Sequence, residues 1–425
     1  MKTGPGRPTT ESTEDGNTSG RRRAQGVPRW LSTALSLAAL YVLLLLGFSR
    51  LAPLITVPDE AIALTPAGGG LGAAVHLLLG RPGGTDFLVD YASAYALVHH
   101  GDAYEIAEKL SERVGAPWPV STANTHPPTM LPFILPFLAG DYGSALGAWS
   151  LAMLFVLILS VRFLEMPWAV AGGVGVALAV SFPGAYGIGN PVPLIGLGIA
   201  IAYRWRNHPL LAGLGIAIAA APKISGILIV IPFLLSRRFK AVAVAAGVYG
   251  MMAGLPVLFQ SNVWTRYSHA GVRAAVLNAT RSDNASWLHL AEKCGVSVIV
   301  VIALLAVLTI VAAIITRDTF WPTVWLIVAA LPIAWMYSLL TLVPLAVQVV
   351  RKGSSAAIGL IIAAAGLMIG SPPSAHWPVM VFPVVTVLAF IGLLLTRPPT
   401  DERFWLPHWI AKFGPARLSQ WQSER

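Results

Sequence analysis

VSVIVVIALLAVLTIVAAII, from Val296 to Ile315, contains no charged side chain. A helix that crosses the hydrocarbon core of a bilayer needs about 20 predominantly apolar residues, and this stretch is long enough. Of the chain's 425 residues, 56% are hydrophobic and 11% are charged. Soluble proteins of this size are much less apolar, so lipid must be the solvent for most of the chain. The sequence predicts an all-α polytopic membrane protein.

Apolar segments recur on both sides of this stretch, and some are interrupted by proline or glycine. A window of about 19 residues predicts about 12 transmembrane or re-entrant helices. The first is expected from Trp30 to Leu51 and is retained rather than cleaved as a signal peptide. The others are expected at 142–163, 167–184, 191–203, 209–221, 224–235, 241–259, 320–334, 336–350, 356–370 and 377–395. Several are short for a membrane span, and broken helices of this kind can line a cavity.

Three regions follow from composition. Residues 1–28 are polar and basic and are expected to form a disordered cytoplasmic arm. Residues 29–397 are expected to form the membrane domain. Residues 398–425 carry tryptophans among basic residues and are expected to be an amphipathic tail on the inner membrane surface. The single cysteine, Cys294, excludes an intramolecular disulfide and disfavours a cysteine-ligated metal site.

The basic residues indicate how the chain is oriented in a cell membrane. With the N-terminus inside, every second connection between apolar segments is basic, carrying Arg162, Arg204 with Arg206, Arg237 with Arg238 and Lys240, Arg317, Arg351 with Lys352, and Arg397. Cytoplasmic loops are enriched in lysine and arginine in this way. The net charge of +10 is therefore explained by topology, and we expect no nucleic-acid partner. Both termini are predicted to be cytoplasmic.

The intervening connections are predicted to lie on the outer side. They carry the polar residues that could take part in catalysis or substrate binding. Asp86 and Asp90 lie at the start of a helix-like stretch, DFLVDYASAYALVHHG. A carboxylate at a helix N-terminus can be a simple cap, or it can be a general base at the membrane surface. His126-Pro127-Pro128 and a short apolar run, interfacial or re-entrant, follow. This run would bring the acidic segment down against the bilayer.

Cationic residues fall on the same side. The stretch from Trp264 to Lys293 contains Arg266 and Arg281, which are either solvated loop charges or ligands for a phosphate. Lys223 lies between two apolar segments. A lysine there is costly unless it reaches the interface by snorkelling or pairs with an anion. Asn190 and His376 also fall at outer ends of apolar segments, where such residues are often helix caps.

Several short motifs are found along the chain. Each is unspecific alone, but their order and their outward placement together are characteristic. They are Asp86-Phe87 to Tyr91 with Gly101 to Tyr104, His126-Pro127-Pro128, Gly189-Asn190 with Pro193-Leu194 and Pro222-Lys223, Asp283 to Ser286, and Ser371-Pro372 with His376. Over most of the chain after residue 30, the sequence resembles the polyprenyl-phosphate-sugar-dependent glycosyltransferases of family 87. These are membrane enzymes of the GT-C architecture, mostly actinobacterial. His126 stands where that family usually has tyrosine, and Asn190 where glutamine is common.

The resemblance implies an enzyme that transfers a mannosyl or arabinofuranosyl unit from a polyprenyl-phosphate donor to a cell-envelope glycolipid or polysaccharide. Transfer would occur on the outer face by a single inverting displacement, with no nucleotide, metal or cofactor at the site. We expect Asp86 to be the base and Lys223, helped by an arginine, to stabilise the departing phosphate, with Asp90 as the competing base. Substrate-binding candidates are Tyr91, His126, Asn190, Lys223, Arg266, Arg281, Asn284 and His376.

Two other functions are compatible with the composition. A secondary transporter or lipid flippase also has about a dozen helices with buried polar residues. Transporters, however, concentrate polar groups near the membrane midplane and usually show related halves, whereas here these residues gather at one surface. A non-catalytic scaffold is the third possibility. It would place no constraint on Asp86 or Lys223.

Overall fold

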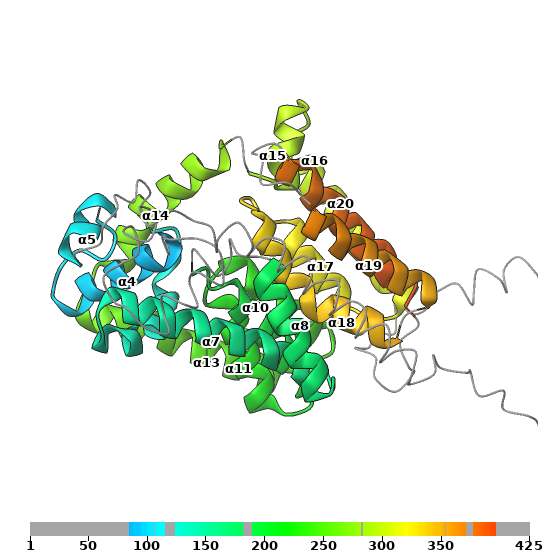
Figure 1. Ribbon diagram of the computed structural model, residues 1–425, viewed down its shortest axis with the longest axis horizontal. Helices are drawn as coiled ribbons and strands as arrows, with labels where there is room; N and C mark the ends of the chain where they lie inside the picture. Colours follow the sequence, from blue (N-terminus) through cyan, green and yellow to red (C-terminus); the bar gives the residue numbers. More distant parts are fainter. Residues whose placement is uncertain are drawn as a thin grey trace, which may run out of the picture.

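The computed structural model describes residues 85–105, 107–114, 124–181, 189–281, 284–352, 354–370 and 377–396. Within these ranges every regular element is a helix (Figure 1). The predicted N-terminal arm, first transmembrane helix and C-terminal tail lie outside the described residues, as does His376.

The described helices fall into two halves of the chain. Those of the first half are α4 (Thr85–Val98), α5 (Ala107–Arg113), η1 (Pro128–Met130), α6 (Leu131–Ile134), η2 (Leu135–Ala139), α7 (Tyr142–Phe163), α8 (Trp168–Ser181), α10 (Val192–Arg204), α11 (Pro209–Ala220), η3 (Ile224–Ile229) and α12 (Val230–Leu235). Those of the second half are α13 (Phe239–Phe259), α14 (Val263–Ala279), α15 (Trp287–Lys293), α16 (Val298–Thr316), α17 (Phe320–Ala329), η4 (Met336–Leu342), α18 (Val343–Lys352), α19 (Ser355–Gly370) and α20 (Trp377–Leu394).

The apolar segments predicted within the described residues fold as helices, except that residues 330–334 of the segment predicted at 320–334 lie beyond the end of α17. A second difference lies in a polar stretch. Residues 260–293, expected as an outer connection, form helices α14 and α15 joined by a short link. The expectation of a loop was wrong because the charges of this stretch mask a helical pattern. On α14, Val263, Gly271 and Ala274 are buried, whereas Arg266 and Arg273 are exposed.

Three described helices, α7, α13 and α16, are long and apolar enough to cross a membrane, judged by length and composition. Side chains on α13 and α16 point away from the protein: Leu258 is 81% exposed and Ile299 is 77% exposed. Large apolar side chains in such positions are typical of a surface that faces lipid. The other apolar helices are shorter, so the predicted total of about 12 remains a prediction.

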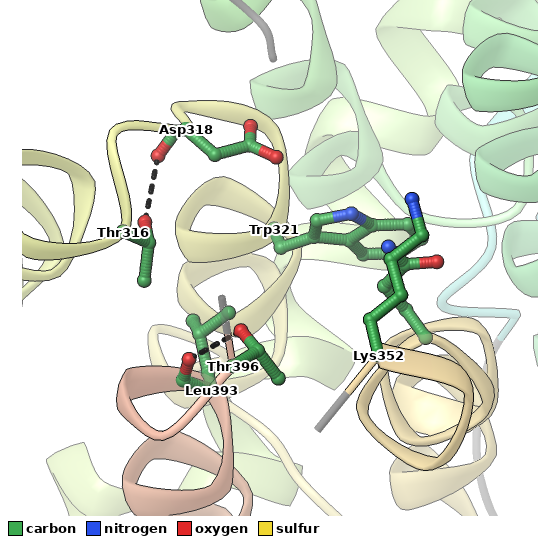
Figure 2. A pocket seen from close by; sticks show the side chains of 7 residues that line it. Thr316, Asp318, Trp321, Lys352, Leu393 and Thr396 are labelled. Atoms are coloured by element: carbon green, nitrogen blue, oxygen red, sulfur yellow. Dashed lines mark hydrogen bonds between the residues drawn. The ribbon is translucent and has the colours of Figure 1, made fainter. Parts of the chain in front are cut away.

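The connections separate into two groups at the two ends of the helices. At one end are those predicted to be cytoplasmic: Glu165, after α7, pairs with Arg204 at the end of α10 and with Arg351 of α18. A small pocket at this end lies between the α16–α17 connection and the ends of α18 and α20 (Figure 2). At the other end, Asn190 before α10 contacts Asp86 of α4, and Asn284 contacts Pro332. Connections predicted to share a side of the membrane therefore touch one another.

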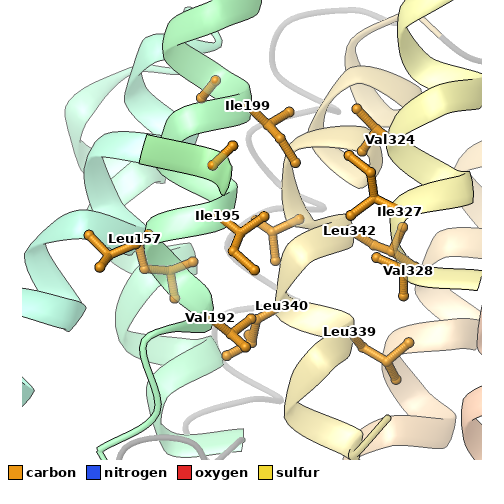
Figure 3. Close-up of a cluster of buried hydrophobic side chains, with 14 of the residues drawn as sticks. Leu157, Val192, Ile195, Ile199, Val324, Ile327, Val328, Leu339, Leu340 and Leu342 are labelled. Carbon is orange, nitrogen blue, oxygen red and sulfur yellow. The ribbon is translucent and has the colours of Figure 1, made fainter. Parts of the chain in front are cut away.

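The core lies between α7, α10 and α11 on one side and α17 and η4 on the other. Ile195 and Ile199 of α10 face Val324 and Ile327 of α17 (Figure 3). Burying such side chains contributes about 1.5–3 kcal/mol each when the alternative is water. Where the alternative is lipid, close packing of small residues matters more.

Helices α10 and α11 cross through a pair of glycines. A Cβ on Gly198 would lie 2.5 Å from the carbonyl oxygen of Gly215, and one on Gly215 would lie 2.7 Å from that of Gly198. Both distances are shorter than van der Waals contact, so only glycine permits this approach. The crossing fixes the end of α11, from which Lys223 follows.

Candidate functional site

Asp86 occupies the first turn of α4, where the helix dipole favours a negative charge. Its Oδ2 accepts a hydrogen bond from Nδ2 of Asn190 at 2.6 Å and one from the hydroxyl of Tyr337 at 3.4 Å. Neither donor is near Asp86 in the sequence. Its carboxylate therefore joins α4 to the start of α10 and to η4.

Local backbone geometry explains why Asn190 reaches Asp86. Gly189 has φ +70°, and a Cβ there would lie 2.4 Å from Cβ of Phe87. The indole N–H of Trp149 donates to the Gly189 carbonyl at 2.8 Å. Asn190 Oδ1 accepts from the backbone N–H of Val192 at 3.0 Å. The Asn190 amide is thus held on one side by α10 and presented on the other to Asp86.

Asp90 lies one helical turn after Asp86 and has no exposed surface. Nδ1 of His126 lies 3.0 Å from its Oδ1 and 2.9 Å from its Oδ2. Nδ2 of Asn124 donates to Asp90 Oδ1 at 3.1 Å and to Ser93 Oγ at 3.0 Å. Asp90 is therefore fully engaged with the segment that begins at Asn124.

Lys223 lies in the turn between α11 and η3 with an extended backbone. Its side chain, like that of Asp86, is partly exposed. Thr129 Oγ1 donates to the Ala221 carbonyl at 2.8 Å, which ties this turn to the His126 segment. Lys223 attracts Asp86 electrostatically and repels the imidazolium of His126. Asp86, Asp90, His126 and Lys223 thus form one group, named here the charged cluster.

Burial and charge shift the pKa values of this cluster in opposite directions. Burial raises the pKa of Asp86, although His126 and the Asn190 hydrogen bond oppose it. Burial lowers the pKa of Lys223 to about 8, with Asp86 opposing. For His126, burial alone would lower the pKa, but the adjacent charge and hydrogen bond of Asp90 outweigh it and the pKa rises. A carboxylate and a cation with such shifts are typical of functional sites.

The remaining predicted residues differ in how they relate to this cluster. The Tyr91 hydroxyl donates to the Gly140 carbonyl at 2.8 Å and its ring packs in the core. Asn284 is fully buried, and its amide contacts the carbonyls of Ala279 and Pro332 and the N–H of Ala334. Arg266 pairs with Asp102 at 3.4 Å, and Arg281 lies over the ring of Trp335 at 5.2 Å. These contacts join helices and loops around the cluster.

Two residues of the site, Asn124 and Tyr337, were not predicted. Asn124 holds Asp90 through its Nδ2 and the backbone N–H of His126 through its Oδ1, the latter at 2.8 Å. Its position two residues before His126 was the available signal. Tyr337 contacts Asp86 across 251 residues of sequence. A lone tyrosine in an apolar segment indicates no such partner.

The described residues contain no group of three or more histidine, cysteine, aspartate or glutamate side chains arranged to hold a metal ion. The site's donors and acceptors instead suit proton transfer and anion binding. Carboxylate oxygens accept protons, and a lysine and an imidazolium neutralise a phosphate.

Comparison with known proteins identifies a family for the region that carries most of this site. The family model described as glycosyltransferase family 87 matches residues 124–338. This range includes Asn124, His126, Asn190, Lys223 and Tyr337, whereas the two aspartates of α4 precede it. No curated protein and no solved structure matches the chain. With half of its length matched, the chain belongs to glycosyltransferase family 87.

Proposed function

We propose that this glycosyltransferase moves a mannosyl or arabinofuranosyl unit from a polyprenyl-phosphate donor to a cell-envelope glycolipid or polysaccharide. The reaction would take place at the charged cluster, on the extracytoplasmic face. The electrostatic attraction between Asp86 and Lys223 carries the proposal, because a potential base and a potential phosphate ligand from distant parts of the chain lie close enough to influence each other.

The chemistry requires a base and a cation, but little else from the protein. The acceptor hydroxyl attacks the anomeric carbon, and the bond from that carbon to the phosphate oxygen breaks with its electron pair remaining on the oxygen. Asp86 takes the hydroxyl proton, so its negative charge is neutralised while the phosphate gains one. Lys223 stabilises the charge that develops on the phosphate. Attack opposite the leaving group inverts the anomeric centre.

The exposure of Asp86 supports its role as the base in preference to Asp90. Asp86 is partly exposed and accepts from Asn190 and Tyr337 through Oδ2, whereas both oxygens of the buried Asp90 contact His126. A general base must come within hydrogen-bond reach of the proton that it removes. The partly exposed carboxylate of Asp86 suits this requirement better than the buried carboxylate of Asp90, which is paired with His126.

The apolar outer surfaces of α13 and α16 support a donor that is itself a lipid. A polyprenyl chain cannot leave the bilayer at low cost, because each buried CH₂ contributes about 0.8 kcal/mol. The sugar phosphate must therefore approach from the side, along helices whose surfaces face lipid. Arg266 and Arg281, on and after α14, are candidates for contacts with the acceptor or the donor headgroup. Asn284 and Tyr91 would position the surrounding loops.

The test compares transfer by native and variant protein in membranes. Labelled polyprenyl-phosphate mannose and, separately, the arabinofuranose analogue are incubated with native protein, Asp86→Asn and Lys223→Met. We expect native protein to use one donor, Asp86→Asn to lose roughly 100- to 10,000-fold in rate, and Lys223→Met to lose roughly 100-fold or more.

Matched controls are available within the chain. Asp141 is an exposed N-cap of α7, where asparagine caps equally well, so Asp141→Asn should keep native transfer. Lys240 is exposed at the start of α13, and Lys240→Met should do the same. Full activity of a folded Asp86→Asn would eliminate Asp86 as the base. No transfer from either donor by native protein would eliminate the donor class.

A further inference from the structure

The contacts of Asp90 indicate that its role differs from that of Asp86. Asp90 is completely buried, and its carboxylate contacts His126 and Asn124. A carboxylate without exposed surface cannot meet a substrate hydroxyl unless this network opens. Burying such a charge is costly unless it is paired and hydrogen-bonded. The partners of Asp90 therefore indicate its role.

His126 is held at three points. Its backbone N–H donates to Asn124 Oδ1 at 2.8 Å, its carbonyl accepts from the Tyr104 hydroxyl at 2.9 Å, and its Nδ1 contacts Asp90. Nε2 makes no hydrogen bond to any residue within the described ranges. A carboxylate on Nδ1 fixes the ring orientation and the tautomer, and so presents Nε2 to whatever lies beyond it.

The electrostatic surroundings favour a protonated ring. Asp90 and Asp86 of α4 stabilise the imidazolium, and Lys223 opposes it. Tyr104, in the loop after α4, donates its hydroxyl to the His126 carbonyl, and its ring lies 5.4 Å from the ring of Tyr267 of α14. The two carboxylates outweigh burial and Lys223, which raises the pKa of His126.

We propose that His126 is a second phosphate ligand, donating Nε2–H to the donor phosphate beside Lys223, and that Asp90 is the positioning residue that holds it. This inference rests on the proposed function and deepens it. When the glycosidic bond breaks, the singly charged phosphodiester becomes a doubly charged monoester. The Nε2–H hydrogen bond strengthens as that charge develops, and the proton stays on His126. The acceptor proton goes to Asp86, so no further co-reactant is required.

The experiment measures how the contribution of His126 depends on pH. Affinity for polyprenyl phosphate and kcat/KM for the donor are compared between native protein and His126→Gln, which keeps a hydrogen-bond donor but cannot be charged. We expect a loss of roughly 10- to 100-fold at a pH where the native ring is protonated. This loss should narrow as the pH rises through the pKa of the ring, which the adjacent carboxylates raise above its usual value. His208 is exposed, and His208→Gln should match native protein at every pH.

Asp90→Asn tests the positioning role separately. Without the carboxylate, the pKa of His126 falls, so the pH at which the contribution of His126 is lost should move down. The double variant Asp90→Asn, His126→Gln should have a kcat/KM for the donor little lower than that of His126→Gln alone, because Asp90 acts through His126.

Three outcomes would overturn the inference. The first is a ratio of kcat/KM between native protein and His126→Gln that does not change with pH, and the second is a loss of kcat/KM in the double variant equal to the two single losses combined. The third is failure of both single variants to fold. The last would make the pair structural. If native protein neither transfers from nor binds a polyprenyl-phosphate donor, the proposed function fails first. If native protein does both and the ratio is constant with pH, only this inference fails.

Discussion

Two aspartates one turn apart on α4 differ in almost every physical property. Asp86 lies in the first helical turn, is partly exposed and bonds to neutral donors. Asp90 is buried and pairs with a histidine. From the sequence both were possible bases, because both lie at the start of the same helix-like stretch. The distinction arises from Asn124 and Asn190, which approach from other parts of the chain.

The pH dependence of kcat/KM should respond to Asn190. Its hydrogen bond stabilises the ionised form of Asp86 and so lowers that pKa, against burial, which raises it. Asn190→Leu should raise the Asp86 pKa further. A base is lost when it is protonated, so the acidic limb of the pH profile should move to higher pH. The kinetics are measured on purified protein across the acidic range.

Asn207 provides the control, since it is exposed near the opposite ends of these helices, and Asn207→Leu should leave the acidic limb unchanged. Asn190→Leu also removes an acceptor for Val192 N–H, at a stability cost of about 1 kcal/mol. An acidic limb that stays in place in a folded Asn190→Leu would mean that this limb does not report Asp86.

Among the elements, the crossing of α10 and α11 is the most sensitive to a small change in volume. Gly215→Ala would put a methyl group 2.5 Å from the backbone nitrogen of Ala202. The helices would have to separate, and we expect a loss of about 1–3 kcal/mol in stability. Because α11 leads directly to Lys223, transfer activity should fall too. Thermal unfolding and transfer are measured on the same preparation.

Gly247 on α13 is the matched control, since a Cβ there meets nothing within 4 Å. Gly247→Ala should be neutral or stabilise by up to about 1 kcal/mol, as expected for alanine in a helix. Equal effects of the two substitutions would contradict the tight crossing.

The periodicity and length of the apolar segments were enough to predict most helices of the described residues, but not α14. Its Arg266 and Arg273 reduce the average hydropathy over a membrane-length window, which hides the buried stripe of Val263, Gly271 and Ala274. Window-averaged hydropathy detects helices that are apolar on all sides and overlooks amphipathic helices, which have one polar face. The contact between Tyr337 and Asp86 was unpredictable for another reason, since only tertiary packing brings η4 to α4.

At the scale of the whole molecule, the sole cysteine reports the orientation in the membrane. Cys294 is exposed at the end of α15, on the side predicted to be extracytoplasmic. A membrane-impermeant maleimide should therefore label native protein in intact cells. Labelling is followed by the mass shift of the purified chain.

The control is a Cys294→Ser, Asn207→Cys protein, whose cysteine lies near the end predicted to be cytoplasmic. It should be labelled only after the cells are permeabilised. The reverse pattern would put the charged cluster inside the cell and rule out an extracytoplasmic acceptor.

The exposed leucines, isoleucines and methionine of α13 and α16 have a consequence for every measurement in solution. Met251 is 73% exposed and Leu258 is 81% exposed. Outside a bilayer, surfactant tails must cover these side chains, and their length and curvature differ from those of phospholipids. An unfolding temperature measured in micelles therefore belongs to a protein–surfactant particle. Comparisons between variants have meaning only when the coating amphiphile is the same.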